Sequence, residues 1–129
     1  MLTNESPFAP VAGVTHRDVP LFWWQGFSSA WYLTTVFSLE KFECPERGVF
    51  VVARRDPCGR PIPLMVGTAD DIGDALYTDY REGLIRAIHA GATEIHVHLA
   101  QNIGWQMDSM AQDIAAGWDL PLQKSEFAT

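Results

Sequence analysis

The sequence predicts an α+β fold in which a small central antiparallel sheet is flanked by helices and extended by an N-terminal β-hairpin. Three observations lead to this prediction. The apolar runs 48–55 and 63–67 are separated by turn-forming residues, which is typical of a β-hairpin. An aromatic and β-branched run at 31–39 indicates a strand before that hairpin. After residue 67 the apolar residues recur every three or four positions, which indicates helices.

The N-terminal part divides into an arm and a first hairpin. Residues 1–20 contain three prolines and no periodicity, so they predict an irregular arm. The apolar segments within 21–39 predict two strands joined by a turn at 25–29. Adjacent strand residues point to opposite faces, so we expect one of Trp23 and Trp24 in the core and the other on an outer face. The outer tryptophan is either a contact for a partner or a side chain covered by the helices or the arm.

The part after residue 67 predicts two helices, a strand and a last helix. Acidic and capping residues open a short helix within 68–76. A longer helix at 79–90 is closed by Gly91, and its apolar residues recur at three- and four-residue intervals: Tyr80, Leu84, Ile85 and Ile88. Strict alternation at 93–99 predicts a half-buried strand with Ile95, Val97 and Leu99 inward. Asn102 is expected to cap the last helix, which Pro121 ends. Its apolar stripe comprises Ile103, Met107, Met110, Ile114 and Trp118, and residues 124–129 form a polar tail.

Length and charge limit the classes of protein. The 129 residues suit a single domain. A protein dedicated to binding a phosphate backbone usually has a basic face, so the net charge of −7 argues against that class. No apolar run reaches the roughly 18 residues of a membrane span. Cys44 and Cys58 make neither a zinc set nor a disulfide framework, so we expect free thiols and a cytoplasmic protein.

Two triplets in the central hairpin invite comparison with a known family. Gly48-Val49-Phe50 and Met65-Val66-Gly67, followed by Asp-Asp-Ile and helices, resemble the paired strands of the GIY-YIG nuclease superfamily. The stretch 87–98 is similar to the helix-to-strand passage of bacterial single-domain members, and 110–123 to their last helix and its exit. The resemblance covers residues 48–123. It implies a GIY-YIG-like fold in which the 21–39 hairpin extends the sheet.

The resemblance also implies a chemistry, the metal-dependent hydrolysis of a DNA phosphodiester. Such a site needs tyrosine hydroxyls, an arginine on the phosphate and a glutamate on the metal. The corresponding positions of this chain are, in that order, Phe50 and Met65, Ala75, and Ala111, while the closing asparagine of the family corresponds to Gln123. The four catalytic positions lack the functional group required, so the resemblance implies a non-catalytic, degenerate member.

Nearby residues offer substitutes for the missing groups. Arg81 lies further along the helical region, and Asp108 is three residues before Ala111 and therefore on the same helix face. Asp113 is two residues after Ala111 and is expected to point away from that face. Arg81 and Asp108 are the candidates for a relocated nuclease site, which would use Mg²⁺ or Mn²⁺; otherwise no cofactor is expected.

One strand carries a second candidate for metal binding. Glu94, His96 and His98 alternate on one face of the predicted strand, and imidazole and carboxylate groups can ligate a metal ion. The alternative is a polar strand face with hydrogen-bonded imidazoles, either wet or covered by a helix.

Three functions remain open from the sequence. The first is an inactive scaffold that binds a protein partner or self-associates through a sheet edge or an outer tryptophan. The second is a divergent nuclease that uses Arg81 and Asp108. The third is a non-cleaving nucleic-acid binder that uses Arg54, Arg55 and Arg60 near the hairpin loop, which the acidic net charge disfavours. We expect the first, with an unknown protein or a second copy as partner and no membrane association.

Overall fold

The computed structural model describes residues 20–40, 42–99 and 106–123, and within them it is a mixed α+β domain. Its six strands are β1 (Leu21–Gln25), β2 (Trp31–Ser38), β3 (Gly48–Arg55), β4 (Pro61–Ala69), β5 (Glu94–Leu99) and β6 (Leu122–Gln123). Its three helices are α1 (Ile72–Tyr77), α2 (Arg81–His89) and α3 (Met107–Gly117).

The strands form one mixed sheet in the order β1-β2-β5-β3-β4-β6. All neighbours are antiparallel except β4 and β6, which are parallel. The predicted sheet was purely antiparallel and lacked β6, because a two-residue strand carries no periodicity that a sequence pattern can reveal. Both predicted hairpins, β1–β2 and β3–β4, are confirmed.

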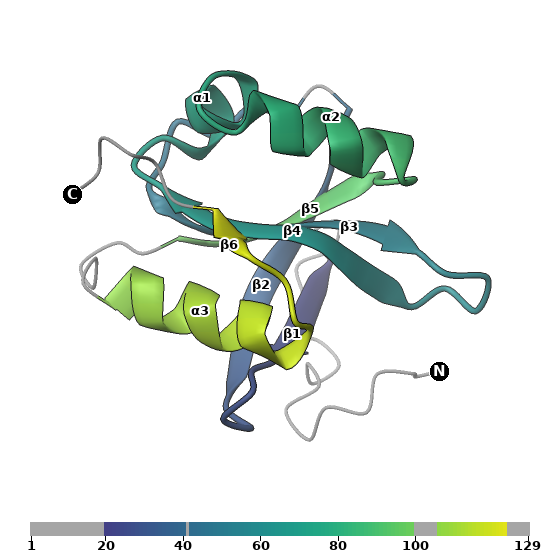
Figure 1. Ribbon diagram of the computed structural model, residues 1–129, viewed down its shortest axis with the longest axis vertical. Coiled ribbons are helices and arrows are strands. Elements are labelled where there is room, and N and C mark those ends of the chain that lie inside the picture. Colours follow the sequence, from purple (N-terminus) through teal and green to yellow (C-terminus); the bar gives the residue numbers. More distant parts are fainter. Residues whose placement is uncertain (1–19, 41, 100–105, 124–129) are drawn as a thin grey trace.

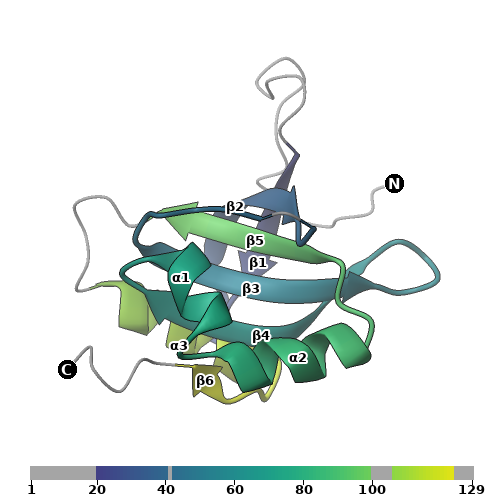
Figure 2. The ribbon, with the colours of Figure 1, turned by 90° about the horizontal axis from the view of Figure 1, so that it is seen from above.

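Helices cover both faces of the sheet. Figure 1 shows α1 and α2 on one face and α3 on the other, and Figure 2 shows the strands fanned beneath α1 and α2. Strand β3 is buried along its first six residues because it lies in the middle of the sheet with helices on both sides. Its continuous apolar run, Val49–Ala53 in all, therefore supplies two separate cores rather than one.

Alternate residues of β3 enter these two cores. Phe50 and Val52 face α1 and α2, where Ile72, Leu76 and Ile95 fill the first core. The other core lies beneath α3 and consists of Trp24, Val49, Val51, Ala53, Val66, Met107, Met110, Ala111, Ile114 and Ala115. The inward prediction for Ile95 and Val97 is confirmed, and Leu99 packs against the same core while partly buried.

Several predicted boundaries and exposures were wrong. Strand β4 runs on to Ala69, because its last residues pair with the start of β3, so the following helix begins only at Ile72, behind the Asp71 cap. Ile88 of the longer helix is 49% exposed, since Leu84 and Ala87 are the residues that face the sheet. Trp118 follows the end of α3 at Gly117 and is 43% exposed, so it is not part of the core stripe.

Two smaller predictions have clear outcomes. Gly91 has a φ of 103°, as the predicted left-handed cap requires. Cys44 and Cys58 are free thiols. The predicted arm at 1–20 apart from Pro20, the Asn102 cap, Ile103 and the tail 124–129 lie outside the described residues. In the described part of the chain, no helix is long and apolar enough to cross a membrane.

Candidate functional site

The four positions that the sequence resemblance matches to catalytic groups are buried and apolar. Phe50, Met65, Ala75 and Ala111 are 0%, 3%, 6% and 0% exposed. The first three belong to the core beneath α1 and α2, whereas Ala111 belongs to the core beneath α3. Gln123 is half-buried in β6. The structure therefore divides these positions between two faces of the sheet.

The glycines of the two triplets have local packing reasons. A Cβ atom on Gly67 would lie 2.7 Å from the ring of Phe50 and 2.8 Å from the backbone oxygen of Gln123. A Cβ atom on Gly48 would overlap the backbone oxygen of His98. Only a glycine allows these close approaches between neighbouring strands.

The two substitute residues come from helices on opposite faces of the sheet. Arg81 begins α2 and is exposed, while Asp108 lies in the first turn of α3 and is exposed. The hydroxyl of Thr68 donates to Oδ1 of Asp108 over 3.4 Å. Asp113 points away from the Ala111 side, as predicted, and reaches the β1–β2 turn.

The polar face of β5 is occupied by a chain of hydrogen bonds. The indole N–H of Trp24 donates to Nδ1 of His96 over 3.0 Å, and Nε2 of His96 lies 2.7 Å from Oε1 of Glu94. Arg55 donates from Nε to Oε2 and from Nη2 to Oε1 of Glu94, over 2.7 and 2.8 Å. Because an indole can only donate, Nδ1 of His96 must accept, and the proton is on Nε2.

The charge states of this chain follow from its geometry. Burial lowers the pKa of His96, and the hydrogen bond to Glu94 only partly opposes that effect. Burial raises the pKa of Glu94, but the hydrogen bonds from His96 and Arg55 outweigh it and bring the pKa down to about 2. At neutral pH this series of hydrogen bonds therefore contains a neutral imidazole between an indole and an ion-paired carboxylate.

These contacts argue against the predicted metal ligands acting together. Both ring nitrogens of His96 have hydrogen-bond partners, and the two oxygens of Glu94 accept from Arg55. His98 hydrogen-bonds through Nδ1 to the backbone oxygen of Leu33 over 2.9 Å. Within the described ranges, no three histidine, cysteine or acidic side chains are placed to hold a metal ion. The alternative, a strand face of hydrogen-bonded imidazoles, is the arrangement observed.

Asp113 holds the β1–β2 turn against α3. Its carboxylate accepts from the Ser28 backbone over 2.8 Å, from the Ser28 hydroxyl over 2.6 Å and from the Tyr32 hydroxyl over 2.8 Å. The Phe27 N–H donates to the backbone oxygen of Asp113 over 2.9 Å. Burial raises the pKa of Asp113, but the hydrogen bonds from Ser28 and Tyr32 lower it overall. These hydrogen bonds, which we call the Asp113 clamp, fix the turn and leave the Phe27 side chain 76% exposed.

Asp56 fixes the β3–β4 loop in a similar way. Its Oδ1 accepts from the backbone N–H groups of Cys58 and Arg60, over 2.8 and 2.9 Å, an arrangement typical of Asx-type turns. The hydrogen bond from the Arg60 backbone is the main cause that lowers the pKa of Asp56. Arg55 adds a hydrogen bond from Nη1 to the Gly59 oxygen over 2.7 Å. The loop is therefore ordered by its own side chains.

The two fixed loops enclose an open groove of about 1000 Å³ with the end of α3. We call it the aromatic groove, and its aromatic and cationic lining comprises Phe22, Trp23, Trp24, Phe27, Trp31, Trp118, Arg55 and Arg60. The ring of Trp24 lies 4.9 Å from that of Phe22 and 6.2 Å from that of Trp118, both edge-on. No carboxylate is among the described residues that line it. Sequence reasoning found the aromatic run and the arginines but did not bring them together.

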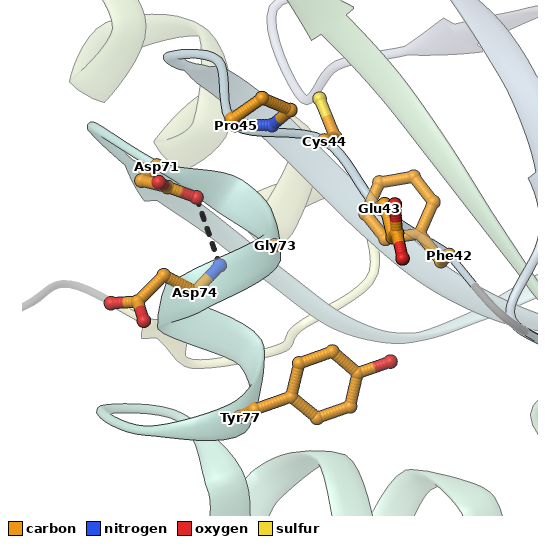
Figure 3. Close-up of a pocket in the computed structure, with 8 residues that line it drawn as sticks. All are labelled: Phe42, Glu43, Cys44, Pro45, Asp71, Gly73, Asp74 and Tyr77. Carbon is orange, nitrogen blue, oxygen red and sulfur yellow. Dashed lines mark hydrogen bonds between the residues drawn. The ribbon is translucent and has the colours of Figure 1, made fainter.

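A second hollow of about 660 Å³ lies between residues 42–45 and α1, and Figure 3 shows its lining. Oδ1 of Asp71 accepts from the backbone N–H of Asp74 over 2.9 Å, which caps the helix. Burial raises the pKa of the Cys44 thiol, and in Figure 3 its sulfur points away from the Asp74 carboxylate. These groups are placed neither to activate the thiol nor to share a ligand.

No family model, curated protein or solved structure matches this chain. Functional inference therefore depends on the geometry of the chain itself, and the aromatic groove is the larger of the two hollows described above.

Proposed function

We propose that this chain is a degenerate GIY-YIG-like domain that acts as a protein-interaction scaffold rather than as a phosphodiesterase. The observation that carries the proposal is the aromatic groove, which exposed Phe27 and Trp118 line together with Arg55 and Arg60. Tryptophan and arginine are enriched among the residues that dominate protein–protein binding energy. The partner is another protein chain, with a second copy of this chain included in that class.

The buried positions support the non-catalytic half of the proposal. A phosphodiesterase of the resembling kind needs hydroxyl, guanidinium and carboxylate groups that reach the substrate. Phe50, Met65, Ala75 and Ala111 provide none of these groups and are nearly inaccessible to solvent. Removal of one such group costs orders of magnitude in rate, so a chain that lacks all four is not expected to cleave DNA at a useful rate.

The loops that border the groove are already ordered in the unbound protein. Asp113 fixes the turn that carries Phe27, and Asp56 fixes the loop that carries Arg60. A surface that is already ordered loses little conformational entropy on association, which leaves more of the contact energy for affinity.

The experiment is a selection of peptides from an unbiased displayed library, followed by titration of the enriched peptides. We expect affinity to fall on Trp118→Ala and Phe27→Ser but not on Ile88→Ala, an exposed apolar residue of α2. Light scattering over a range of concentrations tests for a second copy as partner, with the same variants. A chain that remains monomeric and yields no groove-dependent peptide would overturn the proposal.

The competing nuclease reading has its own test. Plasmid nicking is measured at low salt with magnesium, manganese or calcium, for the wild type and for Arg81→Ala and Asp108→Ala. We expect no nicking with any of these ions. Metal-dependent nicking that both substitutions abolish would establish a relocated nuclease site and contradict the scaffold proposal.

A further inference from the structure

We propose that the occupant of the aromatic groove is an acidic peptide segment in which a carboxylate flanks an aromatic side chain. The inference rests on the proposed function, since it names the partner chemistry of the same groove. It follows from the charges and surfaces of the groove, taken one at a time.

The charge of the groove has one sign. Arg55 and Arg60 line it, and no carboxylate is among its described lining residues, although the chain as a whole has a net charge of −7. Glu94 already accepts two hydrogen bonds from Arg55, so that guanidinium is largely neutralised. Within the described residues Arg60 makes no two-point ion pair of that kind. The Asp56 carboxylate, which accepts from the Arg60 backbone, attracts its charge without forming an ion pair with the guanidinium. The Arg60 side chain is therefore the group that a ligand carboxylate would meet.

The number of cations selects between two classes of anionic ligand. Binding to a single-stranded nucleic acid draws its affinity from several phosphate contacts, and a protein with a net charge of −7 repels a polyanion. The single guanidinium of Arg60, carried on an ordered loop, instead matches one or two carboxylates of a short peptide segment. The charge of this groove thus favours an acidic peptide over a nucleic acid.

The walls of the groove call for an aromatic anchor. Trp118 is 43% exposed, and its ring packs edge-on at 6.2 Å from that of buried Trp24. Phe27 stands 76% exposed at the opposite loop, where the Asp113 clamp holds the turn. An aromatic side chain of the partner would bury these rings from water, and aromatic pairs contribute beyond the area they bury.

Arg55 acts as a positioning residue, because its partner Glu94 also contacts His96. Its guanidinium is held by Glu94 and by the Gly59 oxygen, so it orients the loop that presents Arg60. The hydrogen-bond chain from Trp24 through His96 to Glu94 ties this loop to the aromatic wall of the groove. Both halves of the recognition surface are therefore joined through one hydrogen-bond network, which runs from the buried Trp24 and His96 to the partly exposed Arg55.

The test titrates short synthetic peptides while the tryptophan fluorescence of the protein is followed. One peptide carries phenylalanine flanked by glutamates, a second replaces the glutamates with glutamines, and a third replaces phenylalanine with alanine. We expect the first to bind and each replacement to weaken binding by roughly tenfold or more. Arg60→Gln should weaken the acidic peptide by a similar factor and leave the glutamine peptide unchanged. Arg86→Gln, an exposed arginine of α2, is the matched control.

Other outcomes would overturn the inference. Equal binding of the acidic peptide to the wild type and Arg60→Gln would remove the charge argument. Oligothymidylate binding that Trp118→Ala abolishes would assign the groove to single-stranded nucleic acid. Self-association that Arg60→Gln abolishes would assign it to a second copy.

The failure of this inference is distinct from that of the proposed function. Library peptides that bind through Trp118 but lack acidic residues would overturn the acidic-peptide inference and leave the scaffold proposal standing. A groove that binds no protein segment at all would overturn both.

Discussion

Arg55 and Glu94 are joined by two parallel hydrogen bonds, from Nε to Oε2 over 2.7 Å and from Nη2 to Oε1 over 2.8 Å. The arginine side chain is 43% exposed and the glutamate side chain 12%. The pair thus spans the boundary between solvent and the buried His96. Such a two-point pair fixes the orientation of both groups more firmly than a single contact does.

The first prediction concerns acid stability. The pKa of Glu94 falls from 4.5 to about 2 on folding, so the unfolded chain takes up a proton before the folded chain does. The resulting stability is present above about pH 4.5 and is lost as the pH falls through about 2. We expect Glu94→Gln to lose about 1 to 2 kcal/mol of unfolding free energy at pH 7, discounted for partial exposure. Denaturant titrations at several pH values measure this difference.

The same experiment also provides the result that would contradict this prediction. Because the glutamine variant has no carboxylate at this position, its stability should depend less on pH between about 5 and 2 than that of the wild type. Asp113 also has a lowered pKa and remains in both proteins, so its contribution cancels in the difference between the two curves. That difference reports Glu94 together with the change that its loss causes at its partner His96. Parallel curves would show that the Arg55 pair contributes nothing to acid stability.

The second prediction concerns the protonation state of His96. Its pKa lies below 6.5 because the ring is buried, and Trp24 requires an acceptor at Nδ1. We expect a neutral imidazole with its proton on Nε2 at pH 7. The folded state resists protonation while the unfolded state does not, so His96 removes stability as the pH falls below about 6.5. Nitrogen-15 chemical shifts of the ring measure the tautomer directly, and shifts typical of two protonated nitrogens at pH 7 would contradict it.

The fold could be predicted from local patterns because most of its elements carry them. The β3–β4 hairpin is read from two apolar runs around turn residues, and β5 from strict alternation. Strand β6 could not be read, since it depends on Gly67 allowing a close approach to Gln123 and not on any local preference. Ile88 repeats at helical spacing but faces solvent, because spacing alone does not say which part of a wide apolar face meets the sheet.

The candidate site could not be predicted from the sequence, for a different reason. Trp24 and His96 are 72 positions apart, and Ser28 and Asp113 are 85 apart. No pattern within one element relates them, because only the strand order β1-β2-β5 and the placement of α3 bring them together. The Glu94, His96 and His98 alternation was a real signal that these polar groups share a face. It could not distinguish a metal site from a buried network, since both require the same residues at the same spacing.

The third prediction concerns the clamp between the β1–β2 turn and α3. A Cβ atom added to Gly26 would overlap the carboxylate of Asp113, and the φ of Gly26 is not in the left-handed region. Gly26→Ala should therefore destabilise the protein by about 1 to 3 kcal/mol through this overlap alone. Asp113→Ala should cost a similar amount through the lost hydrogen bonds. Urea unfolding of both variants measures these losses.

A double-mutant cycle separates the clamp from general damage. In the Gly26→Ala/Asp113→Ala protein the overlap no longer exists, so the combined loss should be smaller than the sum of the single losses by roughly 1 kcal/mol or more. The Asp113→Ala background thus rescues the alanine at position 26. Strict additivity would show that the two residues do not press on one another in solution.

The last prediction concerns Ala111, the position to which the proposed resemblance assigns a metal-binding glutamate. Ala111 is 0% exposed and packs among apolar residues beneath α3, which include Val51 and Ile114. A carboxylate placed there loses its hydration without a partner, so Ala111→Glu should cost on the order of 3 kcal/mol or more. Gln112→Glu, its exposed neighbour, should cost less than about 0.5 kcal/mol. Thermal unfolding with and without Mg²⁺ or Mn²⁺ decides the point. A variant as stable as the wild type, or one that the metal stabilises, would contradict the buried, apolar placement of position 111.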